Sequence, residues 1–489
     1  VSHGSVLSAP RIREQLLQLD RLVVVDPRRT ETAALASQHV PIRPGTDALL
    51  LLALLHTIFA EGLARPGRLA GFTDGLDAVA AAAAEFTPER VAASTGVGPE
   101  EVRALARAFA AAPSAVAYGR VGVSTQPFGG LCQWLLVVLN VVTGNLDREG
   151  GAMFALPAAD LLPFARRAGL QGSFGRWRSR VRGLPEFGGE LPAAALAEEM
   201  DTPGPGQVRG LITVASNPAL SVPNGVRLRR ALAGLEFMVS VDFYLNETTR
   251  HAHVVLPPTS ALERDHYDAA FHLLAVRNTA KYSPPVFPRA PDARDDWEIL
   301  LELGAGLQAR RGHRLLATAL RRGVGALGPT GLVAWLLRTG PYGPGLIPFA
   351  RGLTLARLRD APHGVDLGPL RPCLPGRLPA GWTRIRLAPA PFIEDVERLR
   401  RSLDGAASGL VLVGRRDLRS NNSWMHNSER LTRGKDRCTL LMHPGDAAAR
   451  GLADGARVQV RSRVGDVEVA LEVTDAMRPG VVCLPHGYG

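Results

Sequence analysis

An acidic residue follows a short apolar run near the start of the sequence, and two arginines come just after it. Val23–Val25 has the composition of a strand, Asp26 ends it, and Arg28 and Arg29 precede the next expected helix. A carboxylate at a strand end can accept hydrogen bonds from a ribose or a guanine edge, while guanidinium groups and a helix N-terminus attract phosphate. The pattern fits a nucleotide-binding corner, although a capped helix with surface arginines explains the same residues.

A second turn lies a few residues further on, in the run Pro-Ile-Arg-Pro-Gly-Thr-Asp. Gly45 permits a tight turn, Thr46 is expected to cap a leucine-rich helix, and Asp47 stands in its first turn. A carboxylate there stabilises the helix dipole, which is sufficient to explain Asp47. A role in ligand binding is the alternative.

Two strand ends in the middle of the chain carry hydroxyl, amide and carboxyl groups. Ser216 and Asn217 follow one apolar run, Ser221 comes soon after, and Asp242 and Thr248 follow the next run. Asp242 could bind a second nucleotide or cap a helix. The Asn-Pro and Pro-Asn-Gly sequences nearby also form ordinary turns.

A dense polar loop follows an apolar strand near the C-terminus. Amide, indole and imidazole groups of this kind can read the edge of a polar heterocycle. A surface loop needs neither a tryptophan nor three asparagines, so binding is the favoured interpretation. The residues concerned are Gly414, Arg415, Asn421, Trp424, His426 and Asn427.

Alternating helices and strands are expected to position these groups. Such an order predicts an α/β fold with parallel sheets, because parallel strands need helical crossovers. In the first part we expect strands at Leu22–Val25 and Ala115–Tyr118, and helices at Ile12–Asp20 and from Thr30, Asp47, Leu76 and Glu100. In the second part we expect strands at Leu211–Ala215, Phe237–Val241 and His253–Leu256, with helices after Asn224 and near Asn246.

The end of the chain changes to a β pattern. Alternating apolar residues separated by glycine turns predict a small barrel. Its strands are expected at Leu410–Val413, Arg457–Val464, Val467–Val473 and Val481–Leu484. The predicted division is therefore residues 1–155 and 156–305 as two Rossmann-like domains, 306–395 as a connecting segment, and 396–489 as the β-barrel domain.

Composition narrows the class of protein. The net charge of +11 comes from arginines that are scattered along the sequence, and no helix-turn-helix, zinc-finger or RNA-binding motif accompanies them, so nucleic acid is not expected as a partner. Four cysteines lie far apart, without a C-x-x-C pair, which favours a reducing compartment such as the cytoplasm. The apolar runs are shorter than the roughly 20 residues that span a bilayer, and we expect them to be buried helices.

Taken in order, these segments resemble the molybdopterin oxidoreductases of the dimethyl sulfoxide reductase superfamily, which bind two molybdopterin guanine dinucleotides. Residues 25–33 and 41–48 look like one dinucleotide-binding pair. Residues 216–218 and 242–257 are similar to the half that binds the other, and Gly122 ahead of Thr-Gly-Asn matches a glycine turn of the family. From Ser408 onward the chain looks like the family's C-terminal domain, a barrel of the double-psi type.

The resemblance implies further residue roles and a cofactor. Arg415, Asn421, Trp424, His426, Asn427 and His486 would reach the pterin portions of bis-molybdopterin guanine dinucleotide. Molybdenum would carry out two-electron oxidation or reduction, or oxygen-atom transfer, on a small-molecule substrate, with a possible electron-transfer partner protein. The alternative is a scaffold relative, such as the large subunit of NADH dehydrogenase. A nicotinamide dehydrogenase is disfavoured, since no G-x-G-x-x-G motif stands at a suitable turn.

The sequence also departs from the family pattern. Relatives carry cysteines for an iron-sulfur cluster and a Ser, Cys or selenocysteine metal ligand upstream of residues like these, and neither is found here. The chain therefore looks like a fragment, expected to be inactive alone. Formate dehydrogenases place an arginine where an ungapped comparison puts Trp134, which argues against formate as the substrate.

Overall fold

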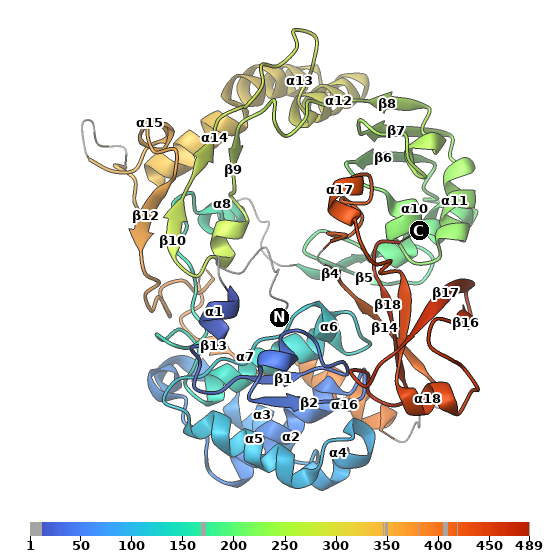
Figure 1. The fold of residues 1–489 in the computed structure, drawn as a ribbon. Coiled ribbons are helices and arrows are strands. Elements are labelled where there is room, and N and C mark those ends of the chain that lie inside the picture. The colour runs from blue at the N-terminus through green and yellow to red at the C-terminus, as the bar shows by residue number, and fades with distance from the viewer. Residues whose placement is uncertain are drawn as a thin grey trace. The chain divides into compact units, whose positions relative to one another are not determined.

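The chain forms two compact units in a computed structural model (Figure 1). The structure describes residues 12–167, 173–345, 347, 351–379, 381–403, 409–417 and 419–488. Unit 1 combines Val1–Phe154 with Leu370–Gly489, and unit 2 is Ala155–Pro369. The expected connecting segment 306–395 is thus divided between the two units.

The first part of unit 1 is a helical core that carries two separate two-stranded parallel sheets. β1 (Val23–Val25) pairs in parallel with β2 (Gln38–Val40), and β3 (Thr73–Asp74) pairs in parallel with β13 (Ile385–Arg386). The helical segments are α1 (Ile12–Leu16), η1 (Ala33–Leu35), α2 (Asp47–Ala60), η2 (Gly67–Phe72), α3 (Leu76–Ala83), α4 (Pro88–Thr95), α5 (Pro99–Ala111), α6 (Val121–Ser124), α7 (Gly129–Val142) and α16 (Ala390–Ser402).

The expected buried helices are confirmed as α2 and α7. Leu52 and Leu55 of α2 and Leu131 and Leu135 of α7 are fully buried in one cluster. Each helix has 14 residues, and no helix in the described part of the chain is long and apolar enough to cross a bilayer. The strand before Asp26 and the helices beginning near residues 47, 76 and 100 are confirmed, whereas the helix expected from Thr30 is only a 3₁₀ turn.

The expected strand Ala115–Tyr118 is wrong. Its backbone is bonded by side chains instead of by a neighbouring strand: Asn140 Nδ2 donates to the carbonyl of Ala117 at 2.8 Å, and Ala117 N donates to Asn140 Oδ1 at 3.0 Å. The amide group of Asn145 accepts from Ala115 N in the same way, at 3.0 Å. Asparagine side chains mimic a peptide group, so they satisfy an extended segment without a ladder.

The C-terminal part of unit 1 is a five-stranded mixed sheet in the order β14-β18-β15-β17-β16. Its strands are β14 (Val411–Arg415), β15 (Thr439–Met442), β16 (Arg457–Arg461), β17 (Asp466–Val473) and β18 (Val481–Pro485), with helices α17 (Glu429–Thr432) and α18 (Pro444–Ala448). The four expected strands are present, and β15 was not expected. Closure of this sheet into a barrel stays a prediction.

Unit 2 contains a three-stranded parallel sheet, as expected of a Rossmann-like half. β6 (Gly210–Val214), β7 (Phe237–Val241) and β8 (Val254–Leu256) lie side by side (Figure 1), with β7 in the middle. Helix α11 (Gly225–Ala233) connects β6 to β7, and Asn224 caps it by accepting from Arg227 N. Leu228 and Leu232 of α11 pack with Met238 of β7 to form the core of this half.

The remainder of unit 2 consists of short strands and further helices. The strands are β4 (Phe174–Arg178), β5 (Pro185–Phe187), β9 (His266–Tyr267), β10 (Asn278–Ala280), β11 (Tyr282–Ser283) and β12 (Val365–Gly368). The helical segments are α8 (Leu161–Arg167), η3 (Ala193–Ala195), α9 (Leu196–Asp201), α10 (Pro218–Ser221), η4 (Thr249–His251), η5 (Phe271–Leu274), α12 (Asp296–Arg310), α13 (Arg314–Ala319), η6 (Leu320–Val324), α14 (Gly325–Thr339) and α15 (Leu355–Arg359).

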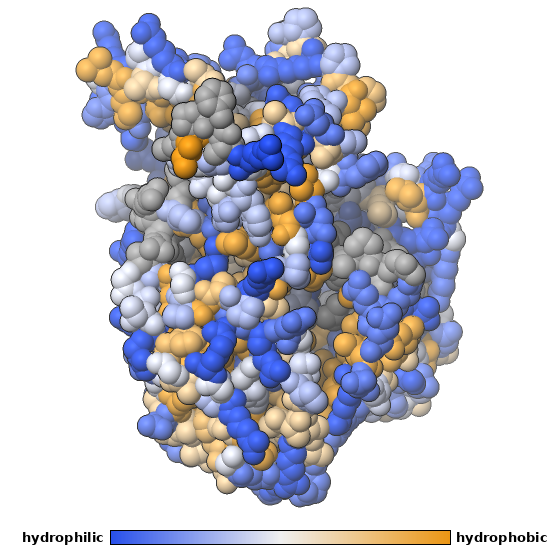
Figure 2. Space-filling view, turned by 90° about the vertical axis from the view of Figure 1, so that its left-hand side faces the viewer, coloured by the Kyte–Doolittle hydropathy of each residue, from blue (hydrophilic) through white to orange (hydrophobic). Residues whose placement is uncertain are grey.

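Hydrophilic side chains cover most of the face drawn in Figure 2. The hydrophobic groups on this face, in orange, lie in small areas scattered between them. This distribution is ordinary for a globular surface, because apolar atoms always contribute part of it.

Candidate functional site

Asp26 lies where the sequence predicts it, directly after the end of β1. Its Oδ1 accepts a hydrogen bond from Arg28 N at 2.9 Å, so the backbone turns sharply around the carboxyl group. Burial raises the pKa of Asp26 above its usual value, while the bond from Arg28 N and the charge of Arg28 act in the opposite direction. Asp26 is thus a carboxylate kept partly out of water at the edge of a sheet.

Asp47 opens α2 and lies close enough to Asp26 for the two charges to interact. Burial raises the pKa of Asp47, the negative charge of Asp26 raises it further, and a hydrogen bond from Gln126 lowers it. Gln126 Nε2 donates to Asp47 Oδ2 at 2.8 Å. Gln126 Oε1 is buried and has no partner among the described residues, so this acceptor is available to a ligand.

The turn before α2 differs from the expectation in one detail. Gly45 has a φ of +82°, which is the left-handed conformation that favours glycine. Thr46 occupies the N-cap position without capping the helix, because its hydroxyl donates to the carbonyl of Arg43 at 2.7 Å. The predicted Thr46 cap is therefore wrong, and Thr46 stabilises the turn itself.

The two arginines after Asp26 have different surroundings. Arg28 is half-buried and lies 3.5 Å from the carboxylate of Glu31. Arg29 is exposed, its backbone N–H donates to the carbonyl of Ala476 at 2.7 Å, and no carboxylate in the described ranges pairs with its guanidinium. Arg29 is accordingly free to bind an anion.

The polar loop of the C-terminal part folds back against the last residues that the structure describes. Asn421 has a φ of +41°, and the His426 ring lies 4.6 Å from the ring of Tyr488, between centroids. His426 Nε2 is buried without a partner among the described residues. Trp424 is 83% exposed and Asn427 is exposed as well, so the loop presents aromatic and amide groups outward.

Arg415 and His486 lie at the base of this loop. The guanidinium of Arg415 donates to the carbonyls of Cys483 and Arg437 at 2.8 and 3.0 Å, and to the Thr439 hydroxyl at 2.9 Å. His486 N donates to the carbonyl of Arg415 at 2.8 Å, and burial lowers the pKa of the His486 imidazole. Arg415 therefore stabilises the sheet, whatever contact it makes to a ligand.

Two glycines predicted at the site occupy different kinds of backbone. Gly414 lies within β14, and Gly122 lies within the short helix α6. A Cβ at either position would find open space. Neither glycine is required by its packing within the described chain, and the predicted role of both in cofactor binding stays a prediction.

Two of the predicted residues of unit 2, Asn217 and Thr248, belong to one hydrogen-bonded network. Thr248 is fully buried, and its hydroxyl donates to Asn217 Oδ1 at 2.7 Å and accepts from Ala219 N at 3.0 Å. Asn217 Nδ2 donates to the carboxylate of Glu247 at 2.8 Å, and this bond is the largest cause of the lowered pKa of Glu247.

Asp242 and two serines complete this group in unit 2. Asp242 directly follows β7 and accepts from Tyr244 N at 3.0 Å. Ser216 and Ser221 are exposed, and the hydroxyl of Ser221 donates to the carbonyl of Asn217 at 3.0 Å. Asp26 and Asp242 thus each follow a parallel strand, in different units. That they face a common crevice stays a prediction.

Trp134 is buried inside unit 1. It is 7% exposed, its ring stacks on Phe392 at 5.5 Å and 9°, and its Nε1 donates to the carbonyl of Leu387 at 2.8 Å. A side chain with these contacts packs α7 against α16. These contacts give Trp134 a structural role, and the expectation that formate is not the substrate stays a prediction.

Trp134→Phe tests the role of this side chain. The variant keeps a stacking ring but leaves the Leu387 carbonyl without its donor, so we expect a loss of about 1–2 kcal/mol in the free energy of unfolding. Urea unfolding measures the loss, with Trp177→Phe as the control at an exposed tryptophan. Unchanged stability together with an altered substrate preference would contradict this assignment.

Sequence reasoning missed several residues of the site. Gln126 contacts Asp47 from 79 positions away, and Tyr488 contacts the His426 ring although the two residues are far apart in the sequence. No local sequence pattern predicts such long-range contacts. Asn246 and Glu247 could have been predicted from their position, because they lie beside Asp242 and Thr248 in a loop at the end of a strand.

Comparisons with known proteins identify the family of the chain. The family described as Molybdopterin oxidoreductase matches residues 3–305, and the Molydopterin dinucleotide binding domain matches residues 410–489. The chain is 26% identical over 484 residues to "Probable oxidoreductase YoaE" of Bacillus subtilis, covering 94% of this chain and 64% of that protein. It is 25% identical over 512 residues to the dimethyl sulfoxide/trimethylamine N-oxide reductase of Rhodobacter capsulatus, covering 96% and 61%.

A solved structure shares the fold. Acetylene hydratase from Pelobacter acetylenicus has a TM-score of 0.70 and 20% sequence identity, covering 96% of this chain and 67% of that one. The chain spans under two thirds of the length of the two curated relatives named above. Because the family match covers more than half of the sequence, the chain belongs to the molybdopterin oxidoreductases, within the dimethyl sulfoxide reductase superfamily.

Proposed function

We propose that the chain is the cofactor-binding body of a molybdenum oxidoreductase that holds bis-molybdopterin guanine dinucleotide, with its substrate unassigned. The observation that carries the proposal is the pair of half-buried carboxylates, Asp26 and Asp47, with Gln126 beside them. Burying two like charges close together is unfavourable unless donors from a ligand satisfy them. Guanine supplies such donors through its ring N–H and its amino group.

The polar groups of unit 1 fit the remaining parts of such a ligand. Gln126 Oε1 is a buried acceptor without a partner in the described chain, and Arg29 is a cation without a carboxylate beside it. A pyrophosphate would be bound favourably by Arg28 and Arg29. His426 Nε2, buried without a described partner next to Tyr488, fits the polar edge of a pterin.

Each unit then has a distinct role toward the cofactor. Asp26 and Asp47 accept from one guanine, and Asp242 with the Asn217 and Thr248 network orients the second dinucleotide. When bound, the molybdenum–pterin group supplies two-electron redox chemistry or oxygen-atom transfer. The residues of this chain bind the cofactor, orient it and offset its negative charge.

The proposal is tested by the content of the purified chain. From cells that make the molybdenum cofactor, we expect molybdenum to copurify, and mild acid to release guanine nucleotide at about twice the molybdenum content, as a bis-dinucleotide requires. Mass spectrometry measures both. Protein that folds normally and contains neither would overturn the proposal and favour the scaffold alternative.

A further inference from the structure

The two segments of unit 1 meet along a short seam formed by Pro27–Arg29 and Ala476–Arg478. Arg28 and Met477 form an antiparallel bridge, Arg29 N donates to the carbonyl of Ala476 at 2.7 Å, and Arg478 N donates to the carbonyl of Pro27 at 3.1 Å. The backbone that follows Asp26 is therefore hydrogen-bonded to the C-terminal sheet domain.

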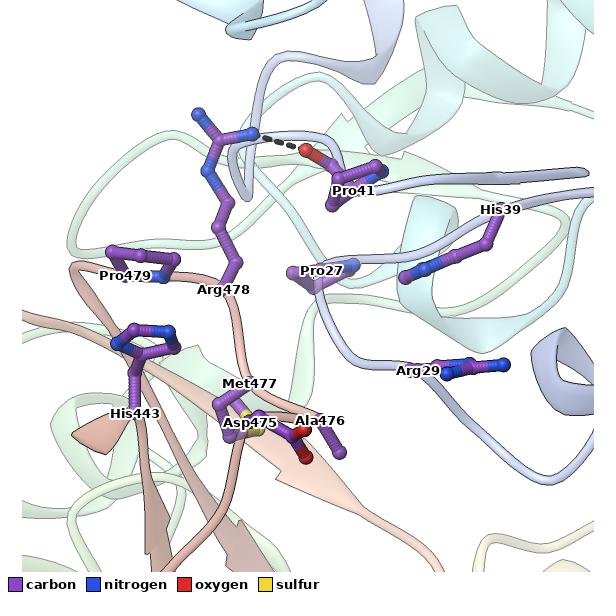
Figure 3. Close-up of a pocket in the computed structure, with 10 residues that line it drawn as sticks. All are labelled: Pro27, Arg29, His39, Pro41, His443, Asp475, Ala476, Met477, Arg478 and Pro479. Atoms are coloured by element: carbon purple, nitrogen blue, oxygen red, sulfur yellow. Dashed lines mark hydrogen bonds between the residues drawn. The ribbon is translucent and has the colours of Figure 1, made fainter. Parts of the chain in front are cut away.

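The Arg478 side chain extends this seam to the second predicted segment. Its Nη1 donates to the carbonyl of Pro41, the first residue of the turn that leads to Asp47 (Figure 3). Burial, and then the charge of Arg43, lower the pKa of Arg478, and no carboxylate in the described part of the chain pairs with it. The Arg478 guanidinium is thus partly removed from water, and its hydrogen bond to Pro41 holds the turn before α2.

Gly96 provides the space for this contact. It ends α4 with a φ of +70°, and a Cβ there would overlap the Arg478 guanidinium. Figure 3 shows Arg478 extending to Pro41 on one side of Pro27, while His39 and Arg29 lie on the other. A pocket of about 400 Å³ separates these groups, so side chains do not fill the seam.

We propose that Arg478 is a positioning residue that holds the Asp26 and Asp47 segments in register for the nucleotide, and so couples docking of the C-terminal sheet to cofactor binding. The identity of the ligand rests on the function proposed above. The coupling follows from the contacts: Arg478 is bonded to the first segment through its backbone and to the second through its side chain. Loss of the guanidinium frees the turn before α2 while leaving every predicted ligand-contacting residue in place.

The first experiment replaces Arg478 and follows the seam directly. Arg478→Met keeps the linear stem without the donors, and Arg478→Lys keeps the charge and an ammonium donor group in place of the planar guanidinium. In the cofactor-free chain, hydrogen exchange at the amides of Arg29 and residue 478 is expected to become about tenfold faster in Arg478→Met, and less so in Arg478→Lys. The guanine nucleotide retained per protein is expected to fall by a similar factor in the same order.

A matched control separates this effect from general loss of charge. Arg457 of β16 makes an exposed ion pair with Glu468 in the same sheet. Arg457→Met should leave both the seam amides and the nucleotide content unchanged, because exposed pairs contribute little.

The second experiment displaces Arg478 without changing it. Gly96→Ala is expected to reproduce Arg478→Met, whereas Gly62→Ala places the same residue at a φ of +64° with nothing within 4 Å of its Cβ. In an Arg478→Met background, with the guanidinium gone, Gly96→Ala should cost no more than Gly62→Ala does. A non-additive cycle of this kind identifies the Gly96–Arg478 contact as the cause.

The outcomes are distinguishable. If the seam amides or the nucleotide content of folded Arg478→Met match those of the unmodified chain, Arg478 does not position the site and the inference is overturned. If the unmodified chain retains no guanine nucleotide at all, the proposed function fails, while the exchange measurements still decide whether Arg478 controls the seam.

Discussion

Asp26→Asn and Asp47→Asn, combined in one chain, should reduce retained guanine nucleotide at least about 100-fold while making the cofactor-free protein more stable at neutral pH. The loss follows because an amide presents one acceptor and a repelling N–H₂ group where a carboxylate presents two acceptors. The gain follows because burial opposes the charged form of both residues, and Asn removes that charge.

The pH dependence gives an independent readout of the same two groups. Both folded-state pKa values are raised from the usual 3.8, so their contribution to stability is complete at lower pH and is lost as pH rises through the raised values. Urea unfolding of the cofactor-free chain should therefore show a fall in stability above about pH 4 that the double variant lacks.

Asp77→Asn is the matched control for this pair. Asp77 is also in the first turn of a helix, α3, but it is exposed. Replacing Asp77 removes a similar interaction with the helix dipole, but it removes no buried charge because Asp77 is exposed. Neither the nucleotide content nor the pH dependence of stability should therefore change. Full nucleotide retention by the double variant would show that Asp26 and Asp47 do not bind the nucleotide.

Asp147→Asn is expected to have the largest effect on stability, a loss of about 2–3 kcal/mol in the free energy of unfolding. The Asp147 side chain is fully buried and accepts from Cys373 N at 2.9 Å, from Leu374 N at 2.7 Å and from the guanidinium of Arg68. Asn at this position turns an N–H₂ group toward one of these donors and leaves Arg68 without its counter-charge.

The backbone conformation at Asp147 suits asparagine as well as aspartate. Its φ is +55°, a left-handed conformation that Asn adopts as readily as Asp, so backbone strain does not contribute to the loss. Asp74→Asn is the control, since Asp74 and Arg384 also join distant parts of unit 1 but are about half exposed. We expect that control to cost less than about 1 kcal/mol.

Differential scanning calorimetry or urea unfolding compares the two variants. Because Asp147 accepts from the backbone of Cys373 and Leu374, the Asp147 variant should also show faster proteolysis near residue 373. A cost of Asp147→Asn no greater than that of Asp74→Asn would show that the buried carboxylate does not hold these segments together.

Parts of the fold that depend on neighbouring residues could be predicted from the sequence. β7 was expected with the same ends that it has, because a run of apolar residues there stops at an aspartate. The apolar composition of α2 and α7 predicted burial correctly for the same reason. Asp26 and Asp242 were placed at strand ends because a strand's last residue is visible in its own composition.

Long-range contacts account for what was not predicted. β15 was missed because all of its residues are buried, so the alternation that marks a one-sided strand is absent. Ala115–Tyr118 reads as a strand, yet Asn140 satisfies its backbone from within α7. Gln126 and Arg478 act across 79 and 437 positions, and no local pattern distinguishes them from other glutamines and arginines.

The division of unit 1 between the two ends of the sequence has a consequence for synthesis of the protein. Residues 155–369 form unit 2 without interruption, so this unit can fold as it leaves the ribosome. The helical core formed by residues up to 154 packs against residues that are synthesised much later. Among them are Leu387, which accepts a hydrogen bond from Trp134, and Cys373, which donates one to Asp147. Until then its apolar helices α2 and α7 lack part of their cover, so synthesis of residues 370–489 is the step that completes the packing of unit 1.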